Sequence, residues 1–205
     1  MRPLHLGAIK MEKKIAVFLD RDGTVSEEVG YVNHIKRFKL LPKSAQAIKL
    51  LNKKKILGIV VTNQSGVARD YFTEELVNDV HNKMRKILRK NGAHLDAIYY
   101  CPHHPTVGPQ EYRKDCDCRK PKIGMLKRAE TDFNIALEKS YMIGDRMKDV
   151  IFGHKVGMKS ILVLTGYGLG EYEHQREKWT EQPEYIAKDL LDAVKWIIKD
   201  LKHNK

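Results

Sequence analysis

Short apolar runs alternate with segments of helical periodicity along the chain. The runs Ile15–Leu19 and Ile56–Val61 are apolar throughout, which is typical of parallel strands buried on both faces. Three further runs, Leu95–Tyr100, Ser140–Asp145 and Ser160–Gly166, are interpreted as strands in the same way. Because helical segments separate the runs, the pattern predicts a doubly wound α/β domain with a parallel sheet of about five strands.

The segments between the runs predict helices. Pro42 is expected to open one helix, and another is expected from about Thr73 to Lys90, with Thr73 as its N-cap. A third is expected over Gly124–Phe133, and a fourth follows Asp149. Helices of this length between strands are typical of right-handed crossovers in a parallel sheet.

The last part of the chain predicts one more helix. Apolar residues recur there at helical spacing, namely Ile186, Leu190, Val194, Ile197 and Leu201. Such a face is expected to cover one side of the sheet. The polar stretch 169–183 before it is expected to be a surface excursion. We interpret residues 1–13 as a loosely ordered leader and residues 14–205 as a single domain, the default for a chain of this size.

Composition narrows the class of protein. The chain has 205 residues, of which 42% are hydrophobic, so it can bury one substantial core. It contains no apolar run of about 18 residues, and its N-terminus lacks the apolar core of a signal peptide. We therefore expect no membrane span and a cytoplasmic protein. Three cysteines in such a protein favour buried thiols or metal ligands over disulfides.

The formal net charge of +12 favours acidic or phosphorylated partners. Nucleic acid is one such partner, but the lysines do not form a single stripe with aromatic residues between them. The charge is therefore interpreted as a solvated basic surface rather than as a nucleic-acid interface.

Polar side chains follow the apolar runs at the points where the strands end. Asp20 and Asp22 follow the first run, Thr62 follows the second, Lys120 lies in a loop beyond the third, and Asp145 closes the fourth. In a doubly wound sheet these ends face one crevice. A carboxylate can attack phosphorus where a cation, usually Mg²⁺, offsets its repulsion from the phosphate. A hydroxyl and an ammonium group can then bind the phosphoryl oxygens, so this set predicts phosphoryl transfer.

All three cysteines fall in one charged loop, "CPHHPTVGPQEYRKDCDC". Cys101 and His103 form one closely spaced pair, and Cys116 and Cys118 form a second. Two chelating pairs across a loop suit a closed tetrahedral Zn²⁺ site, although three buried thiols are the alternative interpretation. Four protein ligands leave no open position, so such a metal is expected to be structural and to position the lysine that follows the loop.

Four motifs, "DRDGT", "TNQSG", "CRKPK" and "GDRMKD", resemble those of the haloacid dehalogenase (HAD) superfamily of phosphatases. Within it, "GYV" at 30–32, "TNQSGVAR", "YYCPHHP" and "CDCRKPKIGML" resemble the heptose-bisphosphate phosphatases and the related histidinol-phosphatase domains. The resemblance implies hydrolysis of a sugar bisphosphate, above all of the 7-phosphate of D-glycero-D-manno-heptose 1,7-bisphosphate. A histidinol-phosphate phosphatase is the alternative. A polynucleotide 3′-phosphatase and a noncatalytic, zinc-stabilised nucleic-acid-binding module remain open.

The resemblance also implies roles for individual residues. Asp20 would become an aspartyl-phosphate, and Asp22 would act first as general acid and then as the base that activates water. Thr62 and Lys120 would hold the phosphoryl group. The implied Mg²⁺ ligands are Asp20, Asp145 and the backbone carbonyl of Asp22, with Asp149 behind them near Lys120. The implied Zn²⁺ ligands are Cys101, His103, Cys116 and Cys118.

The length between the motifs predicts a site without a cap domain. The segment from Asp22 to Thr62 is nearly filled by a loop, a helix and a strand. Small loops must then bind the substrate, and the candidate residues are Glu28, Val29, Gly30, Tyr31, Asn63, Gln64, Ser65, Arg119 and Arg146. Of these, Arg119 and Arg146 are expected to hold a second phosphate. The expected partner is a small phosphorylated sugar, and the expected state is a monomer.

Overall fold

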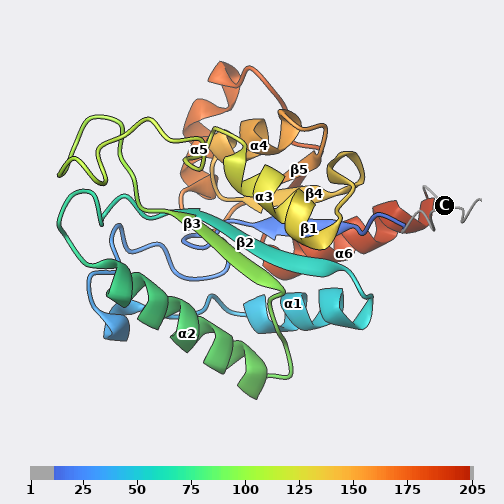
Figure 1. Cartoon of the computed structure of the whole chain (residues 1–205). Helices are drawn as coiled ribbons and strands as arrows, with labels where there is room; N and C mark the ends of the chain where they lie inside the picture. Colours follow the sequence, from blue (N-terminus) through green and yellow to red (C-terminus); the bar gives the residue numbers. More distant parts are fainter. Residues whose placement is uncertain (1–11, 204–205) are drawn as a thin grey trace, which may run out of the picture.

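A parallel β-sheet runs through the centre of the computed structural model, which describes residues 12–203 (Figure 1). Within this range the sheet has six strands in the order β3-β2-β1-β4-β5-β6. The strands are β1 (Ala16–Leu19), β2 (Leu57–Asn63), β3 (Ala97–Cys101), β4 (Tyr141–Gly144), β5 (Lys159–Val163) and β6 (Tyr185–Ala187). The doubly wound α/β fold is therefore confirmed, with one strand more than the pattern predicted.

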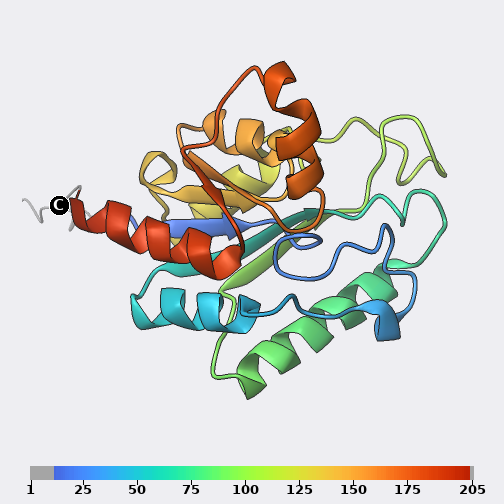
Figure 2. The ribbon, with the colours of Figure 1, turned by 180° about the vertical axis from the view of Figure 1, so that it is seen from behind.

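Helices cover both faces of this sheet. The α-helices are α1 (Ser44–Lys53), α2 (Glu74–Lys90), α3 (Gly124–Phe133), α4 (Met147–His154), α5 (Gly168–Gln175) and α6 (Leu190–His203). Three 3₁₀ turns accompany them in the described residues, namely η1 (Ile35–Arg37), η2 (Leu137–Lys139) and η3 (Arg176–Lys178). Helices α1, α2 and α6 lie on one face, and α3 and α4 lie on the other (Figures 1 and 2).

The core is split between the two faces because successive strand residues point in opposite directions. On β1, Val17 and Leu19 pack with residues of α1 and α6, whereas Ala16 and Phe18 pack with residues of α3 and α4. All four side chains are fully buried. Burying a Val, Leu or Phe side chain stabilises the fold by about 1.5–3 kcal/mol. Coverage of both faces explains why β1 is apolar without alternation.

Several predicted boundaries agree with the structure. The α3 helix spans Gly124–Phe133 as predicted, and the Thr73 hydroxyl caps α2 by accepting a hydrogen bond from the backbone N–H of Leu76. Ile186 was assigned to the last helix, but it lies in β6 and pairs with Leu162 of β5. A three-residue strand is too short for its periodicity to be distinguished from one turn of helix.

The stretch 169–183 was expected to be a polar excursion, but it contains most of α5 and all of η3. Glu181 near its end, and Glu184 just beyond it, contact His154 at the end of α4. The Nδ1 of His154 lies 2.5 Å from a carboxylate oxygen of Glu181, and its Nε2 lies 3.1 Å from one of Glu184. Burial acts to lower the pKa of His154, but the hydrogen bonds to both glutamates outweigh burial and raise it.

All the strands are parallel, so their carboxyl ends share one edge of the sheet, and the site is expected there. The connection from β1 to β2 holds η1 and α1, and the connection from β2 to β3 holds α2. Among residues 12–203, neither connection carries a separate cap domain. Most of the expected leader, residues 1–11, lies outside the described residues, and Lys14 pairs with Ile135 beside β1.

No helix in the described part of the chain combines the length and apolar character that crossing a membrane would require.

Candidate active site

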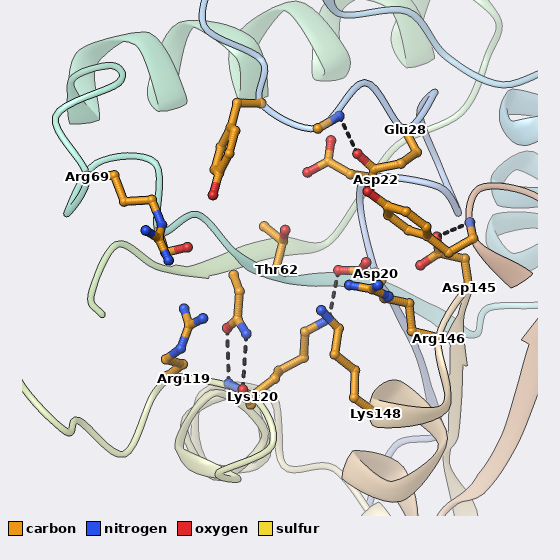
Figure 3. Close-up of a pocket in the computed structure, with 15 residues that line it drawn as sticks. Asp20, Asp22, Glu28, Thr62, Arg69, Arg119, Lys120, Asp145, Arg146 and Lys148 are labelled. Atoms are coloured by element: carbon orange, nitrogen blue, oxygen red, sulfur yellow. Dashed lines mark hydrogen bonds and ion pairs between the residues drawn. The ribbon is translucent and has the colours of Figure 1, made fainter. Parts of the chain in front are cut away.

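A polar cleft of about 310 Å³ opens at the carboxyl ends of the strands (Figure 3). It brings together these predicted residues: Asp20, Asp22, Glu28, Gly30, Tyr31, Thr62, Asn63, Ser65, Arg119, Lys120, Asp145 and Arg146. Arg69, Lys148 and Tyr167 also line the cleft and were not predicted. Val29 and Gln64, which were predicted to bind substrate, are not part of this lining: Val29 packs against the core and Gln64 is buried beneath the cleft.

Three buried carboxylates cluster at the bottom of the cleft, where Asp20 and Asp145 line it and Asp149 lies beneath them. Asp20 follows β1, Asp145 follows β4 and Asp149 lies on α4, and their oxygens lie within 4.8 Å of one another. The Nζ of Lys120 donates to Asp20 Oδ1 and to Asp149 Oδ1, each at 2.7 Å. One ammonium group cannot neutralise three carboxylates if all three are ionised.

Burial and mutual repulsion perturb the ionisation of this cluster. Burial, helped by the charge of Asp20, raises the pKa of Asp145 to about 8. Burial also raises the pKa of Asp20, although Lys120 opposes the change. For Lys120 itself burial favours the neutral amine, but Asp149 and Asp20 outweigh burial and raise its pKa. The lysine is therefore charged, and the carboxylates repel one another unless another cation joins them.

The cluster fits a divalent cation such as Mg²⁺. The Oδ2 of Asp149 is buried and has no hydrogen-bond partner among the described residues. The loops around Asp145 approach so closely that only glycine fits: a Cβ on Gly23 or Gly166 would lie 2.1 or 2.2 Å from Asp145 Oδ2. Carboxylate oxygens are the ligands that Mg²⁺ prefers. The side chain of Asp22 is not part of this cluster.

Lys120 is held in place by an amide side chain at the end of β2. The Nδ2 of Asn63 donates to the carbonyl of Lys120 at 3.1 Å, and the N–H of Lys120 donates to Asn63 Oδ1 at 3.0 Å. Asn63 lines the cleft as predicted, but its side-chain amide is engaged with the backbone of Lys120. Sequence spacing could not identify this contact, because the two residues meet only through the fold.

Gln64 connects two other predicted residues. Its Nε2 donates to the hydroxyl of Thr62 at 2.9 Å and to Oδ2 of Asp22 at 3.0 Å. Because the Thr62 oxygen accepts this bond, its own hydrogen can be donated to a ligand in the cleft. Arg21, which was not predicted, binds the same Asp22 carboxylate from below. Arg21 lies between two aspartates, and nothing in its position indicated where its side chain points.

The predicted cysteine and histidine ligands converge at the end of β3. The Sγ of Cys116 lies 3.4 Å from that of Cys101 and 3.1 Å from that of Cys118, and Nδ1 of His103 lies 3.3 Å from Cys118 Sγ. Ligands that bind Zn²⁺ at about 2.0–2.3 Å in a tetrahedron are separated by roughly 3.5 Å. The four donors can therefore hold a zinc-sized ion, and Arg119 follows the last of them.

Arginines stand on two sides of the cleft. Arg69 and Arg119 lie on the same side, where Arg69 contacts His104 Nε2 at 3.0 Å and Arg119 donates to the carbonyl of His103 at 3.1 Å (Figure 3). Arg146 stands on the other side, 3.4 Å from Glu171 and above the ring of Tyr167. Arg69 lies within the "TNQSGVAR" stretch, but sequence alone did not separate it from its neighbours.

Comparison with known proteins identifies the class. The family model described as HAD-hydrolase-like matches residues 117–193. A crystal structure of D,D-heptose 1,7-bisphosphate phosphatase from B. bronchiseptica, complexed with magnesium and phosphate, superposes with a TM-score of 0.80 and 29% identity. The match covers 91% of this chain and 99% of that one. The fold and its strand-end residues thus define a phosphatase of the HAD type.

Curated relatives specify the family. The D-glycero-β-D-manno-heptose-1,7-bisphosphate 7-phosphatase of Pasteurella multocida is 42% identical over 190 residues, covering 92% of this chain and 99% of that protein. The protein of the same name from Escherichia coli K12 is 43% identical over 182 residues, covering 88% and 93%. The chain belongs to the family of the D-glycero-D-manno-heptose-1,7-bisphosphate 7-phosphatases.

Proposed function

We propose that this chain removes the 7-phosphate of D-glycero-D-manno-heptose 1,7-bisphosphate. The observation that carries this proposal is the buried row of Asp20, Lys120 and Asp149 at the floor of an open cleft whose walls carry surplus arginines. The nucleophile and the lysine at the bottom of the cleft can bind and attack the phosphate that is removed, and the arginines on its sides can bind a second phosphate. The names of the relatives support the same substrate. We also propose that residues 14–205 act as one domain.

In the first step, a carboxylate oxygen of Asp20 attacks phosphorus. The bond from phosphorus to the sugar oxygen breaks, and that oxygen takes a proton from the carboxyl group of Asp22. Lys120 and the Thr62 hydroxyl hold phosphoryl oxygens through the transfer. The products of this step are the sugar alcohol and an aspartyl-phosphate on Asp20.

In the second step, Asp22 takes a proton from water as the water oxygen attacks phosphorus. The bond from phosphorus to Asp20 breaks, which releases inorganic phosphate and restores the Asp20 carboxylate. Asp20, Asp145 and the backbone carbonyl of Asp22 would hold Mg²⁺, and the position of Asp149 in the same cluster makes it a further candidate. When bound, Mg²⁺ offsets the repulsion between the carboxylates and the phosphate.

Substitution of Asp20 tests the chemistry. Asp20→Asn should abolish turnover and leave the protein folded, since an amide is a poor nucleophile and its Oδ1 can still accept from Lys120. Release of inorganic phosphate measures activity, and circular dichroism checks the fold. Turnover near the wild-type rate in the folded variant would rule out covalent catalysis through Asp20.

The second phosphate is proposed to lie near Arg119, with Arg146 facing it across the cleft. Arg69 is added to this set because it stands on the same side as Arg119. A charge-assisted contact from a guanidinium is worth about 1.5–3 kcal/mol, or roughly ten- to a hundredfold in kcat/KM. The 1,7-bisphosphate should therefore be a better substrate than heptose 7-phosphate.

Arg119→Ala should remove most of that margin and leave the rate on the monophosphate nearly unchanged. The assay compares kcat/KM for the bisphosphate, the monophosphate and histidinol phosphate with each variant. An equal loss on the bisphosphate and the monophosphate would place Arg119 elsewhere in the mechanism. Faster turnover of histidinol phosphate than of every sugar bisphosphate would replace the heptose assignment.

We further propose that Cys101, His103, Cys116 and Cys118 bind one structural Zn²⁺. Purified protein should then contain close to one zinc per chain by metal analysis. Cys116→Ser should lose the metal and lower activity, because the loop carries Lys120 into the site only a few residues later. Protein prepared without chelators and found free of zinc would refute this assignment.

A further inference from the structure

The carboxylate of Asp22 is surrounded by hydrogen-bond donors. Arg21 donates from Nε to Oδ1 at 3.0 Å and from its terminal nitrogen to Oδ2 at 2.7 Å. Gln64 Nε2 donates to Oδ2 at 3.0 Å. The Ser26 hydroxyl has a single hydrogen and two acceptors in reach, Asp22 Oδ1 at 3.3 Å and the Arg21 carbonyl at 3.2 Å. Neighbouring residues on an extended chain point apart, so this two-point contact requires the turn that begins at Arg21.

Arg21 is itself fixed from three directions. Its side chain is only 2% exposed, against 19% for Asp22. One terminal nitrogen donates to Gln64 Oε1 at 2.9 Å, and the other lies 3.2 Å from Nε2 of His81. Burial and the nearby arginines lower the pKa of His81 to about 3, so the ring is neutral and its Nε2 can accept from Arg21.

The orientation of the Gln64 amide follows from its partners. Its oxygen faces Arg21, which can only donate, and its nitrogen faces the Asp22 carboxylate, which can only accept while ionised. The same nitrogen also reaches Thr62. Arg21, Gln64 and His81 therefore form one buried network beneath the cleft, and Asp22 is the member of it that reaches the cleft surface.

An ionised carboxylate has about four lone-pair positions, and Arg21 and Gln64 together occupy three of those of Asp22. The fourth, on Oδ1, is free for a proton when Ser26 donates to the Arg21 carbonyl instead. The contacts from Ser26 and Gln64 are single hydrogen bonds, whereas the planar fork of Arg21 holds both oxygens at once. Arg21 therefore sets the position from which Asp22 acts.

We infer that Arg21 is the positioning residue for Asp22, and that His81 and Gln64 keep its guanidinium in place for this role. The inference rests on the proposed function, because it assigns proton transfer to Asp22. Arg21 acts through that aspartate and does not itself line the cleft. Loss of Arg21 should therefore reproduce the kinetic pattern of losing Asp22.

That pattern depends on the leaving group. The oxygen of a sugar phosphate needs a proton as its bond to phosphorus breaks, whereas p-nitrophenolate leaves without one. General acid catalysis contributes roughly 10²–10⁴-fold where it is needed. Arg21→Ala should lower kcat/KM for the sugar bisphosphate about ten- to a hundredfold, and for p-nitrophenyl phosphate less than about threefold. The comparison uses kcat/KM because it ends at release of the leaving group, whereas kcat includes hydrolysis of the aspartyl-phosphate, a step that uses Asp22 with both substrates. Asp22→Asn should show the same selectivity, with a larger loss.

Two further arms separate positioning from a general loss of structure. Guanidinium ion added to Arg21→Ala should restore part of the rate on the sugar bisphosphate, whereas Arg128→Ala, an exposed site on α3, should not respond. Arg21→Lys keeps the charge and loses the fork, so it should remain impaired. The selectivity ratio is kcat/KM for the sugar bisphosphate divided by kcat/KM for p-nitrophenyl phosphate. His81→Gln retains an acceptor for Arg21 and should keep this ratio, whereas His81→Leu should lower it about three- to tenfold.

Equal losses of kcat/KM on the sugar bisphosphate and on p-nitrophenyl phosphate, or no loss on either, would overturn the inference. If Arg21→Ala does not fold, the two His81 variants decide, and an equal selectivity ratio for His81→Leu and His81→Gln would overturn it. Failure of the proposed function gives different results: Asp20→Asn would retain turnover if the chemistry is wrong, and histidinol phosphate would be turned over faster than every sugar bisphosphate if the substrate is wrong. If Asp20→Asn is inactive and Asp22→Asn is selective but the Arg21 variants are not, only the role of Arg21 is wrong.

Discussion

The contact between Asn63 and Lys120 predicts a catalytic defect that can be separated from a loss of stability. Asn63→Ala removes two hydrogen bonds to the backbone of Lys120. Each such bond contributes about 0.5–1.5 kcal/mol, so the variant should lose roughly 1–3 kcal/mol of unfolding free energy. For a chain of this length, that corresponds to a fall in Tm of roughly 2–12 °C.

The chain contains a matched control for this change. Asn52 makes the same pair of contacts with the backbone of His94, where its Nδ2 donates to the carbonyl at 3.0 Å and its Oδ1 accepts from the N–H at 2.9 Å. That contact joins α1 to the segment before β3 and does not line the cleft. Asn52→Ala should therefore lower Tm about as much as Asn63→Ala.

The two variants should differ in activity. Lys120 reaches Asp20 over 2.7 Å, and a displacement of about 1 Å in such a group can cost 10²-fold. We expect Asn63→Ala to lower kcat roughly ten- to a hundredfold and Asn52→Ala to change it less than about twofold. Asn63→Asp should be at least as impaired as Asn63→Ala, because one carboxylate oxygen would face the Lys120 carbonyl.

The assay measures kcat and KM at 25 °C, where both variants remain folded, together with Tm. Asn63 also lines the cleft, so a direct contact with substrate is the competing explanation for any defect. Such a contact would raise KM, whereas a misplaced Lys120 lowers kcat. Equal kcat values for Asn63→Ala and Asn52→Ala would refute the positioning argument, and a change confined to KM would favour the competing explanation.

Three other changes test the carboxylate cluster, the packing of the cysteine loop and the ion pairs of His154 at the end of α4. Mg²⁺ added to chelator-treated protein should raise the Tm of the wild type but not of Asp145→Asn, and an equal rise would exclude Asp145 as a ligand. Gly108→Ala should lower Tm, because its Cβ would lie 1.9 Å from the carbonyl oxygen of Ala68. The raised pKa of His154 stabilises the fold fully below its ordinary value of 6.5, and this stabilisation is lost as pH rises through the folded value. His154→Gln should therefore lower Tm more at pH 6 than at pH 9, and the reverse order would contradict the assignment.

Sequence alone could predict the floor of the site because parallel strands constrain it. Once the runs before Asp20 and Asp145 are taken as strands of one sheet, their carboxyl ends must share an edge. Lys120 joins them because it follows a loop anchored at the end of β3. These predictions needed only the order of elements, and the structure places all three residues in one cleft.

The contacts beneath and around the floor could not be predicted in this way. The direction of Arg21 depends on a turn and on a histidine sixty positions away. Gln64 was predicted to bind the substrate, but its side chain is buried beneath the cleft, where its amide binds Asp22. Arg69 reaches the site from an irregular loop, where no periodicity indicates which way a side chain points. The strand containing Ile186 was missed because three residues carry too little pattern.

An uncapped cleft must obtain its geometry from something other than closure over the substrate. Here individual contacts hold the loops around the sheet edge in place. Asn63 holds the backbone of Lys120, Gly108 lets the cysteine loop pack against the carbonyl of Ala68, and Glu171 holds Arg146. These contacts join the loops at the sheet edge to β2, to a neighbouring loop and to α5. Rigid loops of this kind place cations in advance, which lowers the ordering cost of binding a second phosphate. The preference for a bisphosphate over a monophosphate should therefore fall when a substitution removes one of these contacts, even where the arginines themselves remain.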